Sequence, residues 1–394
     1  MKKSTAFVAT AMVIIAALAI SFIADSKSAN AIPAFARKYN MSCTTCHNPV
    51  PRLKAYGDEF AGNGFVLKDQ DAPRYFVDTG DENLSLIRDF PIAVRMDGYI
   101  KYESVGGQRP DMTTPYLLKL LSGGSLAEDL AYYFYFYMDE RGEVVGVEDA
   151  YLMFNDLFGS ELDIYVGQFQ ISDPLFKREL RLTLEDYEIY KTSVGESSIN
   201  LAYDRGLMLT YGFETGTDVI LEVVNGNGLP EADKFKVYDS DKYKSFVGRV
   251  SQDVNDYARI GGFGYYGKEG VSNPNEVWMI GPDFTVTDGY YAELNVQYLE
   301  RRDSDPLFEG DRDDDVETRG AMAEVIFTPN GDRSKWYGVC LFNWVESDFS
   351  EHDYRTIGLH AGYLLRTNVR LVGELDYDMD TEERRISAGF VAGF

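Results

Sequence analysis

The chain has 394 residues, enough for one large domain or two ordinary ones. Its formal net charge of −26 at pH 7 excludes nucleic acid as an expected partner, because the phosphate backbone would be repelled. The 28 tyrosines, 24 phenylalanines and 36 glycines, with 45% hydrophobic residues overall, are typical of a chain with many amphipathic strands. The composition therefore favours an all-β protein.

Residues 1–31 have the pattern of a secretory signal peptide. Lys2 and Lys3 precede an apolar run from Ala6 to Ala24, and Ala29-Asn30-Ala31 is a small-residue cleavage site. The apolar run is long enough that an uncleaved anchor stays open as an alternative. Because no other stretch resembles a transmembrane helix, any further membrane span must be made of strands.

A Cys43-Thr44-Thr45-Cys46-His47 motif follows the predicted cleavage site. In the C-x-x-C-H pattern, the two thiols add to the vinyl groups of haem and the adjacent histidine becomes the proximal iron ligand. The motif predicts one covalent haem c, attached through Cys43 and Cys46, with His47 as its proximal axial ligand. Export fits this prediction, because c-type haem is attached outside the cytoplasmic membrane.

Three other interpretations of the motif are a disulfide, a thioredoxin-like redox pair and part of a zinc site. Zinc would require further ligands at short spacing, whereas the remaining candidates lie far along the chain at Cys340, His352 and His360. Thioredoxin chemistry would require a βαβ context, and none follows the motif. Covalent haem is therefore the favoured interpretation.

Residues 32–75 are predicted to form the haem-binding segment, and residues 76–90 a linker. Leu53, Tyr56 and Phe60 recur at the spacing of one helix face, which predicts a short helix ending near Gly62 and Gly64. About forty residues are too few to enclose a haem. The ring must therefore borrow a second wall from the rest of the chain.

From Pro91 to Phe394 the pattern changes to period two. In 290–298, for example, apolar residues occupy the even positions and polar residues the odd ones. Strands of about ten residues with one apolar and one polar face are what a transmembrane barrel needs. Sixteen such segments occur, at residues 91–104, 115–121, 128–138, 147–155, 160–170, 204–214, 217–225, 243–252, 256–267, 275–286, 289–301, 318–328, 335–346, 354–366, 368–378 and 384–394.

The connections between these segments are sorted by length. If the first strand rises from the periplasm, the periplasmic connections are short, and the external ones include the long spans 171–203, 226–242 and 302–317. The chain also ends on Phe394, in phase with Phe390 and Ile386. A soluble β-sandwich, the alternative fold, gives no reason for this sorting. The sequence predicts an all-β transmembrane antiparallel barrel of about sixteen strands over residues 91–394, preceded by a small α-helical segment.

Two resemblances rest on these residues. Residues 91–394 resemble a sixteen-stranded bacterial porin, distantly of the phosphate-selective kind, in which Val166-Gly167-Gln168-Phe169 ends a strand. This resemblance implies that the loop 171–203 folds back into the lumen. Residues 32–67, with the Met41-Ser42-Cys43-Thr44-Thr45-Cys46-His47 run, resemble the haem-bearing leader of exported cytochrome c-like proteins of metal-respiring and related anaerobic bacteria. The multihaem conduits of those bacteria carry many C-x-x-C-H motifs, whereas this chain has one.

A low-spin haem needs a sixth ligand, His or Met. Met41 lies two residues before Cys43, on the proximal side, and His352 lies in an outer loop. His360 faces the lumen between Gly358 and Gly362, and is the candidate distal metal ligand. The alternatives are that His360 only hydrogen-bonds to its neighbours, that a lumen methionine ligates the iron, or that the position is open.

Four cationic residues are candidates for a channel constriction: Lys177, Arg178, Arg181 and Arg205. In a porin, charges on an inward loop narrow the pore and set its selectivity. Acidic residues are interspersed among them, so the alternative is an internally paired loop, and no anion preference is expected.

These features predict a haem-carrying outer-membrane barrel that transfers electrons at the periplasmic side, with the haem segment there or in the barrel mouth. Its expected partners are periplasmic or outer-membrane cytochromes and the lipid bilayer. One haem cannot bridge an apolar band about 25 Å tall, so a second redox partner is required if electrons cross the membrane. The alternative function is a porin for small solutes, in which the haem segment acts as plug, gate or sensor. No hydrolytic triad, phosphate loop or HExxH motif is present, so an enzyme is not expected.

Overall fold

The computed structural model describes residues 34–67, 77, 79–81, 84–88, 90–104, 109–140, 142–143, 146–310 and 315–394. The predicted signal peptide, residues 1–31, lies outside the described residues, as do parts of the predicted linker 76–90. None of the helices in the described ranges has both the length and the apolar character that crossing a bilayer requires.

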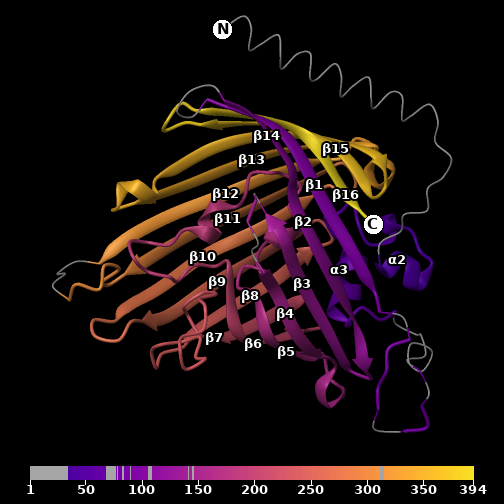
Figure 1. Cartoon of the computed structure of the whole chain (residues 1–394), viewed down its shortest axis with the longest axis horizontal. Helices are drawn as coiled ribbons and strands as arrows, with labels where there is room; N and C mark the ends of the chain where they lie inside the picture. The colour runs from indigo at the N-terminus through magenta and orange to yellow at the C-terminus, as the bar shows by residue number, and fades with distance from the viewer. Residues whose placement is uncertain are drawn as a thin grey trace, which may run out of the picture.

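Sixteen antiparallel strands form one closed barrel, in which β1 pairs with β16 (Figure 1). Each strand pairs with the strands before and after it in the chain, so no strand edge is left open. The predicted strand number is confirmed. The strands are β1 (Ile92–Glu103), β2 (Arg109–Ala127), β3 (Leu130–Glu140), β4 (Gly146–Phe154), β5 (Leu162–Gln170), β6 (Tyr203–Gly212), β7 (Thr217–Val224), β8 (Ser245–Asn255), β9 (Ala258–Glu269), β10 (Asn275–Thr287), β11 (Ala292–Asp303), β12 (Val316–Phe327), β13 (Trp336–Ser347), β14 (Tyr354–Arg366), β15 (Val369–Asp378) and β16 (Arg384–Gly393).

Side chains alternate between the lumen and the outer face, in the phase that the sequence predicts. On β11, Asn295 and Gln297 are buried inside the barrel. Many large apolar side chains on the outer face are exposed, among them Leu207, Leu221, Phe246, Val250, Ile260, Ile280, Val325, Leu359 and Leu375. A band of exposed apolar residues around a closed barrel is the surface that contact with lipid requires.

The second strand departs most from its predicted bounds. The alternating pattern predicts it over 115–121, whereas β2 runs from Arg109 to Ala127. Its outer parts contain Pro110, Gly123 and Gly124, which do not alternate between polar and apolar. They are extended because both β1 and β3 pair with them, so pairing with neighbours overrides the local pattern.

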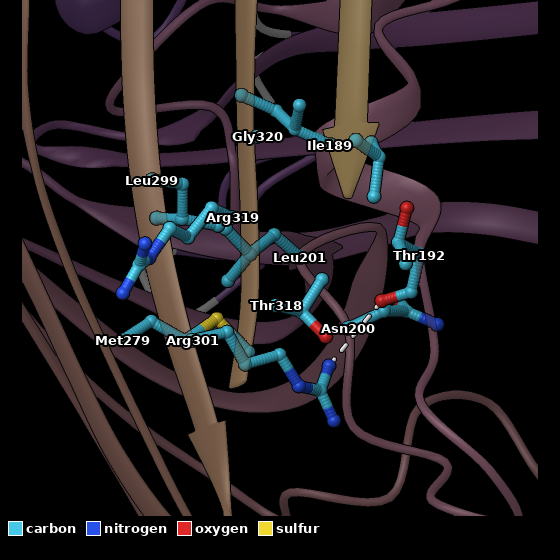
Figure 2. Close-up of a pocket in the computed structure, with 11 residues that line it drawn as sticks. Ile189, Thr192, Asn200, Leu201, Met279, Leu299, Arg301, Thr318, Arg319 and Gly320 are labelled. Atoms are coloured by element: carbon cyan, nitrogen blue, oxygen red, sulfur yellow. Dashed lines mark hydrogen bonds between the residues drawn. The ribbon is translucent and has the colours of Figure 1, made fainter. Parts of the chain in front are cut away.

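The connection 171–202 between β5 and β6 folds into the lumen, as the porin resemblance implies. It contains the one-turn elements η4 (Arg178–Leu180) and α4 (Glu188–Lys191), and α4 packs against β12 and β13. Figure 2 shows Arg301 reaching from the barrel wall to Thr192 of this connection, whose carbonyl accepts a hydrogen bond at 3.2 Å. Arg301 also donates to the carbonyl of Ile199 at 2.6 Å. We call residues 171–202 the inner loop.

The described leader, residues 34–67, holds α2 (Ala34–Tyr39), the short turn η1 (Cys43–Thr45) and α3 (Ala55–Gly62). The predicted helix ending near Gly62 is confirmed, with Phe60 buried. Tyr56, however, is 46% exposed, so it does not share the buried face expected of it. The buried residues of α3 are Gly57 and Phe60, so Gly57 takes the buried position that was expected for Tyr56.

The leader docks at the end of the barrel that carries the short turns. Lys54 pairs with Asp332, in the turn between β12 and β13, at 3.0 Å. Arg52 pairs with Glu293 at the start of β11. Phe65 stacks on Tyr133 of β3 with ring centres 5.5 Å apart. The leader and the inner loop therefore both occupy the lumen.

Candidate functional site

The C-x-x-C-H motif forms one tight turn. Ser42 caps it, since its hydroxyl accepts a hydrogen bond from the amide of Thr44. The amides of Cys46 and His47 both donate to the carbonyl of Cys43, at 3.2 and 2.9 Å. This turn brings the two thiols and the imidazole to the wall of one cavity, because residues three and four apart share a face in a helical turn.

That cavity lies between the leader, the barrel wall and the inner loop, and has a volume of about 280 Å³. We call it the leader cavity. Its leader wall includes Cys43, Cys46, His47, Met41, Phe35, Phe60 and Phe65, its barrel wall includes Arg95, Lys119, Tyr133, Tyr135, Asp149, Tyr151, Asn368, Arg370 and Val391, and its inner-loop wall includes Asp173, Lys177 and Glu179. The barrel thus supplies the second wall that the size of the leader requires.

The two thiols of the motif are not joined to each other. Burial raises the pKa of both Cys43 and Cys46, which favours the protonated thiols. Within the described residues, no group of three or more His, Cys, Asp or Glu side chains is placed to hold a metal ion. The arrangement therefore gives no support to the disulfide or zinc interpretations.

The imidazole of His47 is oriented by a hydrogen bond. Its Nδ1 lies 2.8 Å from the carbonyl oxygen of Pro51, which can only accept, so Nδ1 carries the proton and Nε2 has a free lone pair. A backbone carbonyl on the second nitrogen is the usual partner of a metal-ligating histidine. Burial lowers the pKa of His47, which favours the neutral imidazole that a metal ligand must be.

A close backbone approach fixes the motif against α3. The amide of Lys54 donates to the carbonyl of Cys46 at 2.8 Å. Gly57 lies so near this carbonyl that a Cβ atom there would be 2.4 Å from the oxygen of Cys46. A glycine is required at this position because any side chain would push α3 away from the Cys43–His47 motif.

His360 is buried and faces the lumen, as predicted. Its Nδ1 lies 2.8 Å from Oε2 of Glu374, and its Nε2 lies 3.2 Å from the hydroxyl of Tyr337. It is not among the described residues that line the leader cavity. The structure thus matches the alternative of a hydrogen-bonded lumen histidine and does not bring His360 to the Cys43–His47 motif.

The four candidate constriction residues are not one cluster. Arg178 pairs with Asp186 at 2.6 Å, and Arg181 lies 3.7 Å from the same carboxylate. Arg205 stacks on Tyr238, 4.0 Å from its ring centre. Lys177 lines the leader cavity and pairs with Asp58 of the leader at 3.4 Å. Arg178 and Arg181 therefore match the alternative interpretation of an internally paired loop. Of the four residues, only Lys177 lines the leader cavity.

The barrel residues of the cavity have no common signal in the sequence. Arg95, Lys119, Asp149 and Arg370 are charged residues on strands whose alternate positions are apolar. That pattern places them in the lumen, but it does not say which of them lie at one height in the barrel. Only the closed register brings them together beside the leader.

No protein-family model and no curated protein sequence matches the chain. Among solved structures it is similar to an anion-selective porin from Comamonas acidovorans, with a TM-score of 0.57 and 12% identity over 78% of this chain and 99% of that one. It is also similar to OmpF of Salmonella typhi in complex with daunomycin, with a TM-score of 0.56 and 10% identity over 77% and 97%. A loop-deletion mutant of OmpT, an outer membrane protein of Vibrio cholerae, matches with a TM-score of 0.54 and 12% identity over 78% and 99%. At these identities the likeness shows the fold, which is a porin-like closed barrel of sixteen strands.

Proposed function

We propose that this chain is an outer-membrane barrel that carries one covalent c-type haem on its leader and transfers electrons at the periplasmic side. The observation that carries the proposal is that Cys43, Cys46 and His47 all line one cavity, although a turn of this size could face solvent. The covalent bonds would run from the two thiols, and Nε2 of His47 would supply the proximal ligand.

The walls of the leader cavity fit a flat apolar macrocycle. Phe35 and Phe65 stack with ring centres 4.9 Å apart, and Tyr133 and Tyr151 continue the aromatic wall on the barrel side. Aromatic side chains contribute large apolar area with little loss of conformational entropy. An apolar wall also limits solvent access, which is one of the levers that set the reduction potential of a bound haem.

The proposed location rests on the sorting of the connections and on the apolar outer face. In transmembrane barrels the short turns are periplasmic, and the leader docks at the short-turn end through Lys54 and Arg52. The haem would therefore exchange electrons with periplasmic or outer-membrane cytochromes. Because the apolar band of such a barrel is about 25 Å tall, one haem at this end cannot carry electrons across it without a second redox centre.

A second candidate function is a small-solute porin that the leader closes. The observation that favours it is the contact between the leader and the inner loop, where Lys177 meets Asp58 inside the lumen. Two segments that meet in this way narrow the path between the barrel ends. Liposomes that hold the purified protein distinguish the two functions. Swelling in sugar solution would indicate an open pore and favour the porin. No swelling, together with a reversible haem potential, would favour electron transfer.

Covalent haem is tested by the pyridine haemochrome spectrum of the denatured, membrane-extracted protein. We expect one haem per chain in the wild type and none in the Cys43→Ala, Cys46→Ala double variant, because both thioether bonds would be lost. Cys340→Ala is the matched control, since Cys340 lies on β13 away from the leader cavity and should leave the haem content unchanged. A wild-type protein without covalent haem would overturn the electron-transfer proposal and leave the barrel intact.

A further inference from the structure

Four cationic side chains line the leader cavity: Arg95, Lys119, Lys177 and Arg370. Three of them are paired with carboxylates. Arg95 pairs with Asp97 at 2.7 Å, Lys119 with Glu179 at 2.6 Å and Lys177 with Asp58 at 3.4 Å. These three charges are compensated within the protein, so they need no ligand to balance them.

Arg370 differs from these three. It is 2% exposed, and none of the carboxylates among the described residues forms an ion pair with it. Its Nη1 donates to the hydroxyl of Tyr337 at 2.7 Å, and its Nε has no hydrogen-bond partner among those residues. A buried guanidinium without an anion is costly, because its charge is removed from water and not replaced.

The position of this guanidinium is fixed by its neighbours. Arg370 stands on the inward face of β15, and its guanidinium lies 5.8 Å from the ring centre of Tyr337 on β13. The hydroxyl of Tyr337 in turn contacts His360, whose other nitrogen is held by Glu374. Tyr337 thus anchors Nη1, whereas Nε has no acceptor on a residue that lines the leader cavity. The planar guanidinium matches a planar acceptor such as a carboxylate.

We propose that Arg370 binds a carboxylate of the molecule that occupies the leader cavity. The inference rests on the proposed function, under which that carboxylate is a propionate of the covalent haem. Haem carries two propionates, and both would otherwise compete for cations that already have partners. Arg370 is a binding residue that orients the ring and compensates its charge, while the attachment itself depends on Cys43 and Cys46.

The test compares the wild type with Arg370→Gln, Arg370→Lys and Arg249→Gln in the full-length, haem-loaded protein. Arg249 is the matched control, because it is also a buried lumen arginine, but it pairs with Asp283 and does not line the leader cavity. The readouts are covalent haem content, midpoint potential and the propionate bending bands in the resonance Raman spectrum, which report hydrogen bonds to these carboxylates.

We expect equal haem content in all four proteins. In Arg370→Gln the potential should fall, because loss of a nearby positive charge stabilises the oxidised, more positive haem. A tenfold change in the ratio of oxidised to reduced protein corresponds to about 59 mV for one electron. Arg370→Lys should keep most of the potential and still shift the propionate bands, because lysine retains the charge without the planar fork. Arg249→Gln should leave the bands unchanged.

Two results would overturn the inference in distinguishable ways. Haem-loaded Arg370→Gln with a wild-type potential and wild-type propionate bands would remove Arg370 from the haem site and leave the proposed function standing. A wild-type protein without haem would remove the proposed function as well. Succinate added to the haem-loaded protein separates the two sources of the carboxylate, because binding there that depends on Arg370 would show that no propionate occupies this guanidinium.

Discussion

The barrel and the leader are stabilised in different ways. The barrel closes on itself, since the hydrogen-bonded ladder between β1 and β16 extends from Arg95–Gly393 to Glu103–Arg385. The leader has no such closure. Its buried cluster combines Phe60 and Phe65 with Ala131 and Met153 of the barrel, so half of the leader's core belongs to another part of the chain.

This difference teaches that the leader depends on the barrel and the barrel does not depend on the leader. A closed set of ladders satisfies its own backbone groups, which is the condition for stability in a bilayer. A segment of about forty residues buries too little apolar surface to fold alone. The Cys43–His47 motif therefore lies on a segment whose buried cluster is completed by the barrel.

Deletion of residues 34–67 should have the largest effect. We expect the barrel to fold, because none of the ladders involves the leader, and we expect solute permeability to rise severalfold, because one of the two lumen segments is gone. The measurement is liposome swelling in sugars of increasing size, with the full-length Cys43→Ala, Cys46→Ala variant as the control that keeps the leader. Loss of the folded barrel on gels would show that the leader supports the strands, and would reverse the comparison.

Glu179 ties the inner loop to Lys119 of the barrel wall, Asp186 pairs with Arg178 and Arg181 within the loop, and the titration of both carboxylates gives a pH dependence. Burial acts to raise the pKa of Glu179, but Lys119 and Arg181 lower it to about 2. The pKa of Asp186 is also held below its usual range, because Arg181 and Arg178 outweigh the effect of burial. A lowered folded pKa means that the stabilisation is present above the unfolded value, about 4.3 for Glu, and is lost as the pH falls towards 2.

We therefore expect the amides of residues 171–187 to keep their hydrogen-exchange protection, corrected for intrinsic rates, down to about pH 4 and to lose it between about pH 4 and pH 2. Glu179→Gln should weaken protection already at neutral pH, because removing one partner of a buried pair costs about 3–5 kcal/mol. Glu276→Gln is the control, since its pair with Lys268 lies on the surface. Protection that is unchanged in Glu179→Gln would mean that apolar packing alone holds the loop.

The barrel was more predictable from sequence than the docking of the leader, for a physical reason. Alternation on β11 predicts which residues face the lumen, because the side-chain period of a strand is two and one face meets lipid. The same alternation fails on β2, where Gly123 and Gly124 are extended through pairing with β3.

The candidate site was predictable only in part. Cys43, Cys46 and His47 are recognisable because their spacing is the C-x-x-C-H pattern of haem attachment sites, and the structure brings all three to one cavity. Nothing in the sequence around Arg370 marks it as a residue of this site. It lies more than three hundred residues after the Cys43–His47 motif and reaches the cavity only because the barrel closes. For His360 the alternation predicted that the side chain faces the lumen. It did not predict the height of His360 in the barrel, and His360 does not line the leader cavity.

Two glycines of α3 provide a sharper test of how the leader holds the motif. In an exposed helix, replacing Gly by Ala stabilises by about 1 kcal/mol. Gly62→Ala should show at most this gain, because Gly62 is the last residue of α3 and no atom lies within 4 Å of the added Cβ. Gly57→Ala should instead destabilise by about 1–3 kcal/mol, because its Cβ meets the carbonyl of Cys46.

The measurement for both variants is hydrogen exchange of residues 55–62, together with the optical spectrum of the haem that we propose. A shifted spectrum in Gly57→Ala with a wild-type spectrum in Gly62→Ala would show that α3 positions the motif. Equal behaviour of the two variants would indicate that α3 and the motif move independently, despite the hydrogen bond from Lys54 to Cys46.

The ion pairs between leader and barrel should have the smallest effect. Arg52 and Glu293 are each 21% exposed, whereas Asp332, the partner of Lys54, is 59% exposed. Pairs near the surface contribute about 0–1 kcal/mol, so Arg52→Ala should weaken leader docking slightly and Lys54→Ala hardly at all. A double-mutant cycle of Arg52→Ala and Glu293→Ala, read out by protease cleavage of the leader, isolates the coupling energy. If Arg52→Ala opened the lumen as much as deletion of residues 34–67 does, the docking of the leader would be electrostatic, and high salt would also open the lumen. Because Phe65 stacks on Tyr133, we expect instead that the leader stays docked at high salt.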